Sequence, residues 1–395
     1  MKDKIIFVCQ RYGPEVNGGA EAECRMYAER LTQHYDVEVA TTCAADYVTW
    51  ENVYPSGVET VNGVLVRRFP TVRRRNATRF NYVSQKVMES SHTDRTEKQW
   101  MEEQGPCCPQ LVRYLRKHGR EYRAVLFMTY LYYTTARGID CPARCKILIP
   151  TAHDEWPIYQ RQFARVFDQA DRYIYNAPGE KRFVERLFPV AKDKPSVTVG
   201  AGVTAPEGAL PDVRVRFGIA GPYICYSGRI DESKGCGVLF DYFDRYKRSH
   251  PGDLKLVLTG KAVMPIPERE DVLALGFVSE EEKYAVMRDA VAFVLASEFE
   301  SLSIVVLESM MMGRPVLVNG KCEVLKDHCV LSNAGFYFMN YREFEAELDY
   351  LLTHEREYRS MCENGKQYVS DNYQWDGIVD GIRGLIEDAN SFQSE

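Results

Sequence analysis

Four charged side chains in the second half of the chain have the types and positions that a diphosphate and a sugar would require. Arg229 and Lys234 fall within one short loop, and Glu300 and Glu308 follow with seven residues between them. Arginine binds phosphate through a bidentate fork and lysine binds it as a point charge, while carboxylates accept hydrogen bonds from sugar hydroxyls. The set fits a sugar nucleotide, although such residues near helix starts and in loops are also common on solvated surfaces.

The two glutamates are placed by a strand, a loop and a helix. Residues 290–296 form the continuous apolar run of a strand buried on both faces, and residues 303–312 are predicted to form a helix with Ser303 as its N-cap. Glu300 should then lie beyond the carboxyl end of a parallel strand, beside helix amides that suit a phosphate. Glu308 should lie about five residues into the helix, roughly 7 Å along its axis.

A second loop in the same half would present the two cations. The strand expected over residues 223–227 runs into this loop, and a helix is expected over residues 237–248. Arg229 and Lys234 therefore flank a loop at the carboxyl end of a strand, where two cations can neutralise a diphosphate. Two intervening strands, whose tips could hold a nucleotide base, are expected over residues 254–259 and 272–278.

Length and composition indicate a two-domain globular protein. At 395 residues the chain is longer than one hydrophobic core usually fills, and its 45% hydrophobic and 27% charged residues are ordinary for a soluble protein. No apolar stretch approaches the roughly 20 residues that span a bilayer, and the N-terminal region does not have the pattern of a signal peptide. We therefore expect a cytoplasmic protein.

The charge distribution contains one local exception. The net charge of −6 argues against a nucleic-acid partner. Six arginines nevertheless gather near two phenylalanines, Phe69 and Phe80; they are Arg67, Arg68, Arg73, Arg74, Arg75 and Arg79. This Arg67–Arg79 cluster could make a peripheral contact with an anionic membrane or acceptor, and a solvated basic loop is an equal alternative.

The twelve cysteines are scattered and lack a C-x-x-C pair. Cys141 and Cys145 come nearest to metal-ligand spacing, but no nearby histidine supports a metal site. Free thiols are expected, and no metal-binding residues are predicted.

The first half of the chain begins as a βαβ unit. Strands are expected over residues 4–10 and 36–42, with an amphipathic helix over residues 19–34 between them. Gly18 and Gly19 precede this helix and would allow the backbone to approach a phosphate. The sequence is not G-x-G-x-x-G, and a plain tight turn is the default interpretation of two glycines.

Three further features of the sequence are a histidine after a strand, a linker and a C-terminal helix. His153 follows the buried strand expected over residues 146–151, a position suited to a ligand, although a lone histidine is more often structural. Residues 200–211 contain three glycines and two prolines and form the best candidate linker. The chain ends in a helix expected over residues 374–389.

These pieces occur in the order of a known family. N-G-G-A-E at 17–21, G-R-I-D-E-S-K-G at 228–235, L-G-F-V-S at 275–279 and the paired glutamates followed by M-G-R-P-V-L-V at 312–318 are present in turn. Together they resemble the retaining glycosyltransferases of family 4, which have the GT-B fold. The resemblance covers nearly the whole chain.

The resemblance implies an α/β architecture of two doubly wound, Rossmann-like parallel-sheet domains that face each other across a cleft. Residues 1–205 with 376–395 would form the acceptor-side domain and its crossover helix. Residues 206–375 would form the domain that binds the nucleotide sugar.

The resemblance also implies roles for individual residues. Arg229 and Lys234 would bind the donor diphosphate and stabilise the departing nucleotide. Glu300 would contact the sugar, Glu308 the ribose, and His153 would lie near the reacting sugar. The remaining donor-binding positions that it implies are Gly18, Gly19, Phe277, Val278, Leu302 and Ser303.

One segment departs from the family pattern. The family commonly has Glu-Gly-Phe-Gly where this chain has Glu300-Ser301-Leu302-Ser303. The glycines let backbone amides approach the sugar and phosphate, so the serines could change the donor fit or add a hydroxyl donor.

The implied reaction is transfer of a sugar from a nucleoside diphosphate to an acceptor hydroxyl with retained configuration, without a cofactor. A UDP-sugar is the preferred donor, and a glycan or lipid-linked acceptor in cell-surface polysaccharide or glycoconjugate synthesis is the preferred acceptor. Two alternatives remain, a sugar-nucleotide epimerase of the same fold and a non-catalytic GT-B scaffold.

Overall fold

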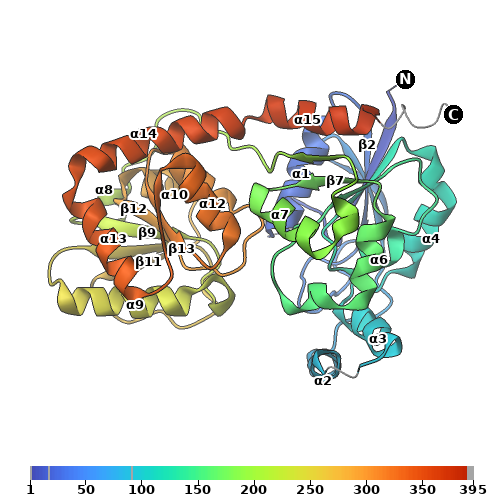
Figure 1. The fold of residues 1–395 in the computed structure, drawn as a ribbon, viewed down its shortest axis with the longest axis horizontal. Coiled ribbons are helices and arrows are strands. Elements are labelled where there is room, and N and C mark those ends of the chain that lie inside the picture. The colour runs from blue at the N-terminus through green and yellow to red at the C-terminus, as the bar shows by residue number, and fades with distance from the viewer. Residues whose placement is uncertain (1, 17, 90–91, 389–395) are drawn as a thin grey trace. The chain divides into compact units, whose positions relative to one another are not determined.

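The computed structural model describes residues 2–16, 18–89 and 92–388. The chain forms two compact units (Figure 1). Unit 1 comprises Met1–Ala201 and Asp376–Glu395, and unit 2 comprises Gly202–Trp375. The chain therefore passes from one unit to the other twice.

Unit 1 is built on an eight-stranded sheet with the order β3-β4-β2-β1-β5-β6-β7-β8. All neighbours are parallel except β3 and β4, which pair as an antiparallel hairpin that turns at Asn62-Gly63. The strands are β1 (Lys4–Val8), β2 (Asp36–Thr42), β3 (Gly57–Val61), β4 (Val64–Phe69), β5 (Ala124–Met128), β6 (Lys146–Ile149), β7 (Arg172–Tyr175) and β8 (Ser196–Thr198).

The helices of unit 1 connect these strands and cover the sheet. They are α1 (Gly19–Leu31), α2 (Ala77–Met88), α3 (Asp94–Gln104), α4 (Pro109–His118), α5 (Tyr133–Gly138), α6 (Arg161–Gln169) and α7 (Pro178–Leu187), joined by α15 (Trp375–Glu387) from the end of the chain. The sequence pattern did not predict α2. Its start is marked by Asn76, whose side chain accepts a hydrogen bond from Arg79 N at 2.9 Å, as an N-cap does.

Unit 2 has a six-stranded parallel sheet with the order β11-β10-β9-β12-β13-β14. The strands are β9 (Tyr223–Ser227), β10 (Lys255–Thr259), β11 (Val272–Gly276), β12 (Ala292–Leu295), β13 (Val316–Asn319) and β14 (Gly335–Phe338). The helices are α8 (Val213–Phe217), α9 (Cys236–Ser249), α10 (Glu280–Asp289), α11 (Ile304–Met311), α12 (Glu323–Ser332), α13 (Tyr341–Thr353) and α14 (Glu355–Asn372).

The central strands of both sheets are buried throughout, because helices cover both faces of a parallel sheet. This accounts for their continuous apolar sequences, such as Ala124–Met128 in unit 1 and Ala292–Leu295 in unit 2. In each sheet the strand order reverses beside the first strand of the unit, between β1 and β5 and between β9 and β12. Such reversals open a crevice at the carboxyl ends of the strands, where ligands bind.

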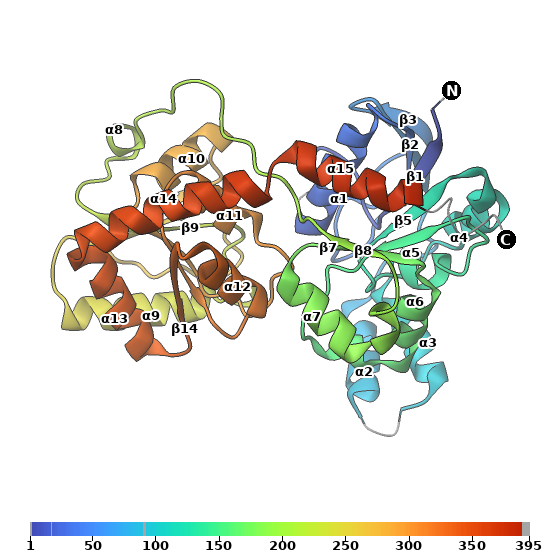
Figure 2. The ribbon, with the colours of Figure 1, turned by 45° about the horizontal axis from the view of Figure 1, so that its top comes forward.

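The two passages between the units run side by side at the edge of unit 2. Val203 N donates to the carbonyl oxygen of Tyr373 at 3.1 Å. A Cβ at Gly202 would lie 2.6 Å from the Trp375 ring, so glycine lets the outgoing chain pass against this tryptophan. The helix α15 then packs on unit 1, where Gly381 approaches Val197 and Val199 beside β8 (Figure 2).

Candidate functional site

The predicted cation loop and the predicted glutamate loop meet at the strand-order reversal of unit 2. The first loop follows β9 and the second follows β12, its neighbour in the sheet. Lys234 Nζ lies 2.7 Å from Glu300 Oε1, so the two loops are joined by an ion pair. The structure therefore brings together two residues that lie far apart in the sequence.

Gly235 makes this approach possible. Its φ is +70°, and a Cβ there would lie 2.1 Å from the carbonyl oxygen of Ala296. No larger side chain fits without moving the backbone at the end of β12. Gly235 is also the residue before α9, so the close packing fixes where that helix begins.

Arg229 is held within its own loop. Its Nε donates to Asp231, and an Nη atom lies 3.2 Å from Ser233 Oγ. Burial acts to raise the pKa of Asp231, but the Ser233 hydroxyl and the Arg229 guanidinium hold it below its usual range. Because Asp231 stays ionised and also accepts from Lys234 N at 3.0 Å, it orders the whole loop around the two cations.

Glu308 lies inside α11 and is buried rather than solvated. Its Oε1 accepts from Lys283 Nζ at 2.9 Å and from the Tyr284 hydroxyl at 3.0 Å. Burial raises the pKa of Glu308 despite the nearby ammonium group. Among the described residues, Oε2 has no hydrogen-bond partner, which leaves one acceptor available for a hydroxyl.

The helix after Glu300 begins where predicted, but Ser303 does not cap it. Ser303 has φ +64° and ψ +69°, and its side chain makes no capping bond. Its buried Oγ has no partner among the described residues. The expected side-chain cap is therefore wrong, and this backbone conformation is the left-handed one that glycine adopts most readily.

The segment expected to hold a base follows β11. The strand ends at Gly276, two residues earlier than predicted, so Phe277 and Val278 lie in the following turn. Phe277 is 84% exposed. An exposed ring at the tip of a strand can stack on a planar group.

In unit 1, the predicted glycine pair lies at the start of α1. A Cβ at Gly18 would be 2.2 Å from Glu21 Oε2, whereas Gly19 has nothing within 4 Å. Glu21 Oε1 is bound by Arg11 Nε at 2.8 Å and by Gln10 Nε2 at 2.9 Å, and all three side chains are buried. Sequence reasoning missed this Arg11–Glu21 ion pair, and it explains why position 18 is a glycine.

His153 lies just beyond β6 and is partly exposed. Its Nε2 is 3.5 Å from Glu155 Oε1, which also accepts from the Tyr130 hydroxyl at 2.8 Å. The preceding residue, Ala152, donates its N–H to Glu180 Oε1 at 2.6 Å. The segment that carries His153 is thus anchored to α7.

Glu180 belongs to a pair of buried carboxyl groups that sequence reasoning also missed. Its other oxygen accepts from Asn176 N at 2.6 Å, and the Asn176 side chain donates to Glu23 at 3.0 Å. Burial raises the pKa of Glu180 to about 8 and that of Glu23 to about 7.

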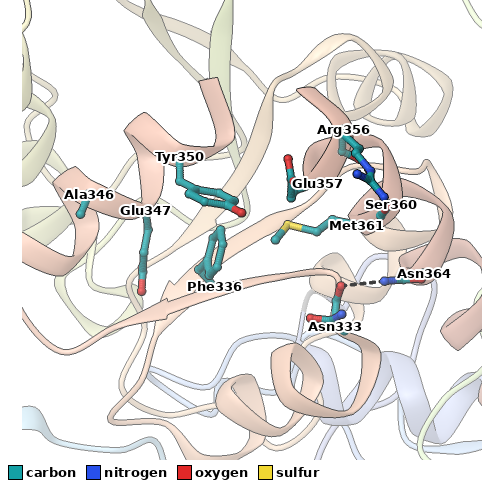
Figure 3. Close-up of a pocket in the computed structure, with 10 residues that line it drawn as sticks. All are labelled: Asn333, Phe336, Ala346, Glu347, Tyr350, Arg356, Glu357, Ser360, Met361 and Asn364. Carbon is teal, nitrogen blue, oxygen red and sulfur yellow. Dashed lines mark hydrogen bonds between the residues drawn. The ribbon is translucent and has the colours of Figure 1, made fainter. Parts of the chain in front are cut away.

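A separate pocket of about 840 Å³ lies in unit 2 (Figure 3). Phe336 and Tyr350 pack edge to face in it beside Met361. None of the predicted site residues lines this pocket. Burial and the nearby Glu343 raise the pKa of Glu347, one of its lining residues, to about 7.

The Arg67–Arg79 cluster is largely paired with acidic side chains of unit 1. Arg67 bonds to Glu38, Arg68 to Glu59, Arg74 to Glu51, and both Arg73 and Arg79 to Glu103. Arg75 lies over the rings of Trp50 and Phe80. Peripheral membrane contact stays a prediction, and this internal pairing weakens the argument for it. Among the described helices, none combines the length and the apolar character that a membrane span requires.

Comparison with known proteins agrees with the fold. Residues 221–354 match the family model described as glycosyl transferases group 1. Mannosylfructose-phosphate synthase of Agrobacterium fabrum is 25% identical over 202 residues, which is 44% of this chain and 42% of that protein. The chain thus matches less than half the length of this curated relative.

Solved structures match over nearly the full chain. Sucrose-phosphate synthase from Thermosynechococcus elongatus superposes with a TM-score of 0.71 at 16% identity, covering 99% of this chain and 100% of that one. HepE of Anabaena, in complex with UDP and glucose, gives 0.70 at 15% identity and covers 98% and 100%. The chain therefore has the predicted GT-B fold, and its second unit contains the segment that matches the glycosyl transferases group 1 model.

Proposed function

We propose that this protein is a retaining glycosyltransferase of family 4, which transfers a sugar from a nucleoside diphosphate to an acceptor hydroxyl. The observation that carries the proposal is the Lys234–Glu300 pair at the β9–β12 reversal. It sets a phosphate-binding cation beside a sugar-binding carboxylate, at the place where such sheets bind nucleotides. The match of residues 221–354 to glycosyl transferases group 1 supports it.

Each group then has a role in the reaction. Arg229 and Lys234 bind the diphosphate and stabilise the charge that builds on it as the bond to the sugar breaks. Glu300 accepts from the sugar hydroxyls, and Glu308 Oε2 accepts from the ribose. Val306 N is the first amide of α11 that donates a bond within the helix. The amides before it have no intrahelical acceptor and would donate to the same negative charge.

The family resemblance implies substitution on one face of the sugar, with the departing phosphate taking the acceptor proton, and we include this course in the proposal. His153 lies near the reacting sugar, and the Gly18–Gly19 loop closes on the phosphates and the acceptor. UDP is the preferred nucleotide, supported by the UDP-bound HepE structure of the same fold. A glycan or lipid-linked acceptor in cell-surface polysaccharide synthesis, with the enzyme in the cytoplasm, completes the proposal.

The test is a thermal-shift series with UDP, GDP, ADP and dTDP on wild type and on Arg229→Ala. A ligand at a hundred times its dissociation constant adds about 2.7 kcal/mol to the free energy of unfolding. One nucleotide should stabilise the wild type, and Arg229→Ala should lose most of that gain. Arg248→Ala is the matched control, because Arg248 is exposed on α9 in the same unit and forms an ion pair with Asp244 of its own helix.

Turnover separates the proposal from its alternatives. An epimerase would convert the sugar nucleotide without an acceptor, and a scaffold would not turn it over. Acceptor-dependent release of the nucleotide by wild type, reduced at least a hundredfold in Arg229→Ala, is the expected result. Equal turnover in the two proteins contradicts the assignment.

A further inference from the structure

A buried histidine in unit 2 contacts the loop that carries Glu300. His328 lies on α12 and is 1% exposed. Its Nε2 is 2.7 Å from the carbonyl oxygen of Leu302, between Glu300 and the start of α11. Its Nδ1 is 3.2 Å from the Tyr368 hydroxyl on α14, a helix that packs against α12 (Figure 2).

The chemistry of the partners fixes the direction of these hydrogen bonds. A carbonyl oxygen only accepts, so Nε2 of His328 carries the proton and donates it to Leu302. Burial lowers the pKa of His328, which keeps the ring neutral and leaves Nδ1 as an acceptor. Tyr368 must then donate to Nδ1, and its oxygen accepts from the Tyr373 hydroxyl at 3.2 Å.

The chain of hydrogen bonds ends where the polypeptide passes between the units. Tyr373 follows α14 directly, and its carbonyl oxygen accepts from Val203 N, in the outgoing passage. Three side-chain hydrogen bonds therefore link Tyr373 to the Glu300 loop, and the backbone of Tyr373 separately holds the outgoing passage at Val203.

We propose that His328 is a positioning residue that sets the backbone of the Glu300–Ser303 loop for the donor sugar nucleotide. This rests on the proposed function, because the loop is where the sugar and phosphate would bind. The need for such support follows from Ser303, which holds a left-handed conformation that costs about 1–2 kcal/mol for a residue with a side chain. A hydrogen bond to the preceding carbonyl oxygen favours that conformation over a relaxed one.

The first experiment compares His328→Phe with His328→Gln. Phenylalanine cannot donate to Leu302, whereas the side-chain amide of glutamine can take the place of imidazole Nε2. His250→Phe is the control, because His250 stacks on Tyr246 at a more exposed position of the same unit. UDP or UDP-sugar affinity is measured by calorimetry, and hydrogen exchange is measured on the peptide spanning residues 300–303 without ligand.

We expect His328→Phe to bind about tenfold more weakly, which corresponds to roughly 1.4 kcal/mol. The peptide should also exchange faster, and His328→Gln should recover most of both properties. Donor KM should rise more than kcat falls. Unchanged exchange in His328→Phe, or an equal loss in the glutamine variant, overturns the proposal.

Tyr368→Phe keeps the test valid if His328→Phe does not fold. It removes the donor to Nδ1 while leaving the His328 bond to Leu302 in place, so exchange of the loop should increase by a smaller factor. If hydrogen exchange of the loop is the same in Tyr368→Phe as in wild type, the loop is not coupled to α14 through His328, and the proposal is contradicted. If wild type binds no sugar nucleotide, the proposed function fails, while the exchange measurement still decides whether His328 positions the loop.

Discussion

Ser303 shows how one residue can carry both a structural cost and a functional possibility. It stands where family 4 commonly has glycine, it adopts φ +64°, and its buried hydroxyl lacks a partner among the described residues. The left-handed backbone and the unsatisfied hydroxyl both destabilise the free protein. A strained residue of this kind is retained where the surrounding structure holds its backbone in the strained conformation.

Ser303→Gly should therefore raise the free energy of unfolding by about 1 kcal/mol, since glycine adopts this backbone without strain and removes the buried hydroxyl. Ser301→Gly is the control. Position 301 has an ordinary φ, so glycine there should lower stability by a few tenths of a kcal/mol. Urea unfolding of the two variants measures the difference. Destabilisation by Ser303→Gly would show that the serine hydroxyl stabilises the free folded protein, and it would contradict the expectation.

Spacing in the sequence predicted residues at the carboxyl ends of strands but not the pairs formed across the sheet. Arg229, Lys234 and Glu300 were all placed in loops by local pattern, and the structure puts the last two in contact. Arg11–Glu21 and Glu23–Glu180 could not be predicted in this way, because their partners are chosen by packing in three dimensions. His328 lies on the apolar side of a helix, where sequence alone favours a core residue.

At the level of elements, glycines in the loops next to the end of β9 let neighbouring loops of unit 2 come into contact. Gly235 allows the start of α9 to approach the end of β12, and Gly260 approaches Gly228 in the same way, with a Cβ there only 2.0 Å from the Gly228 oxygen. The strand and helix pattern predicted these elements well because each is locally periodic. The pattern missed α2, whose apolar face is short, with only Val83 and Val87 buried.

Gly235→Ala should lower the free energy of unfolding by about 2 kcal/mol or more, because the methyl group overlaps the Ala296 backbone and the positive φ is strained. Nucleotide binding should fall with it, since Lys234 is the preceding residue. Gly384→Ala provides a matched comparison. It lies in α15 with open space around it, and alanine there should stabilise by up to about 1 kcal/mol. Thermal unfolding of the two variants, with and without nucleotide, measures the changes in stability and in binding. If Gly235→Ala unfolds at the wild-type temperature, the loop can shift to make room for the methyl group.

Across the whole molecule, buried carboxyl groups in both units set how stability depends on pH. Glu23 and Glu180 in unit 1, and Glu308 and Glu347 in unit 2, all have raised pKa values. In the unfolded chain these groups lose their protons near pH 4.5, whereas the folded protein holds them longer. Between pH 4.5 and the raised pKa values, the folded state therefore binds more protons than the unfolded state, and the free energy of unfolding falls as the pH rises.

We therefore expect the protein to unfold at a lower temperature at pH 8.5 than at pH 6. Glu23, with a pKa of about 7, costs at most about 3 kcal/mol above that pH. Glu23→Gln should flatten the profile between pH 5 and pH 8, because the amide can accept from Asn176 without ionising. Glu29→Gln, on the same helix at a partly exposed position, is the control. A stability that is constant or rises over this range would contradict the expectation.

The discontinuity of unit 1 has a consequence for synthesis on the ribosome. Unit 2 is one continuous stretch, Gly202–Trp375, whereas unit 1 needs residues from Asp376 onward. Helix α15 buries Ile378, Ile382 and Ile386, and it cannot reach β8 until all of unit 2 has been translated. Most of unit 1 is therefore synthesised before unit 2, but its fold is completed only after unit 2 has been made. During that interval the apolar surface beside β8 that α15 covers in the finished fold stays exposed to solvent.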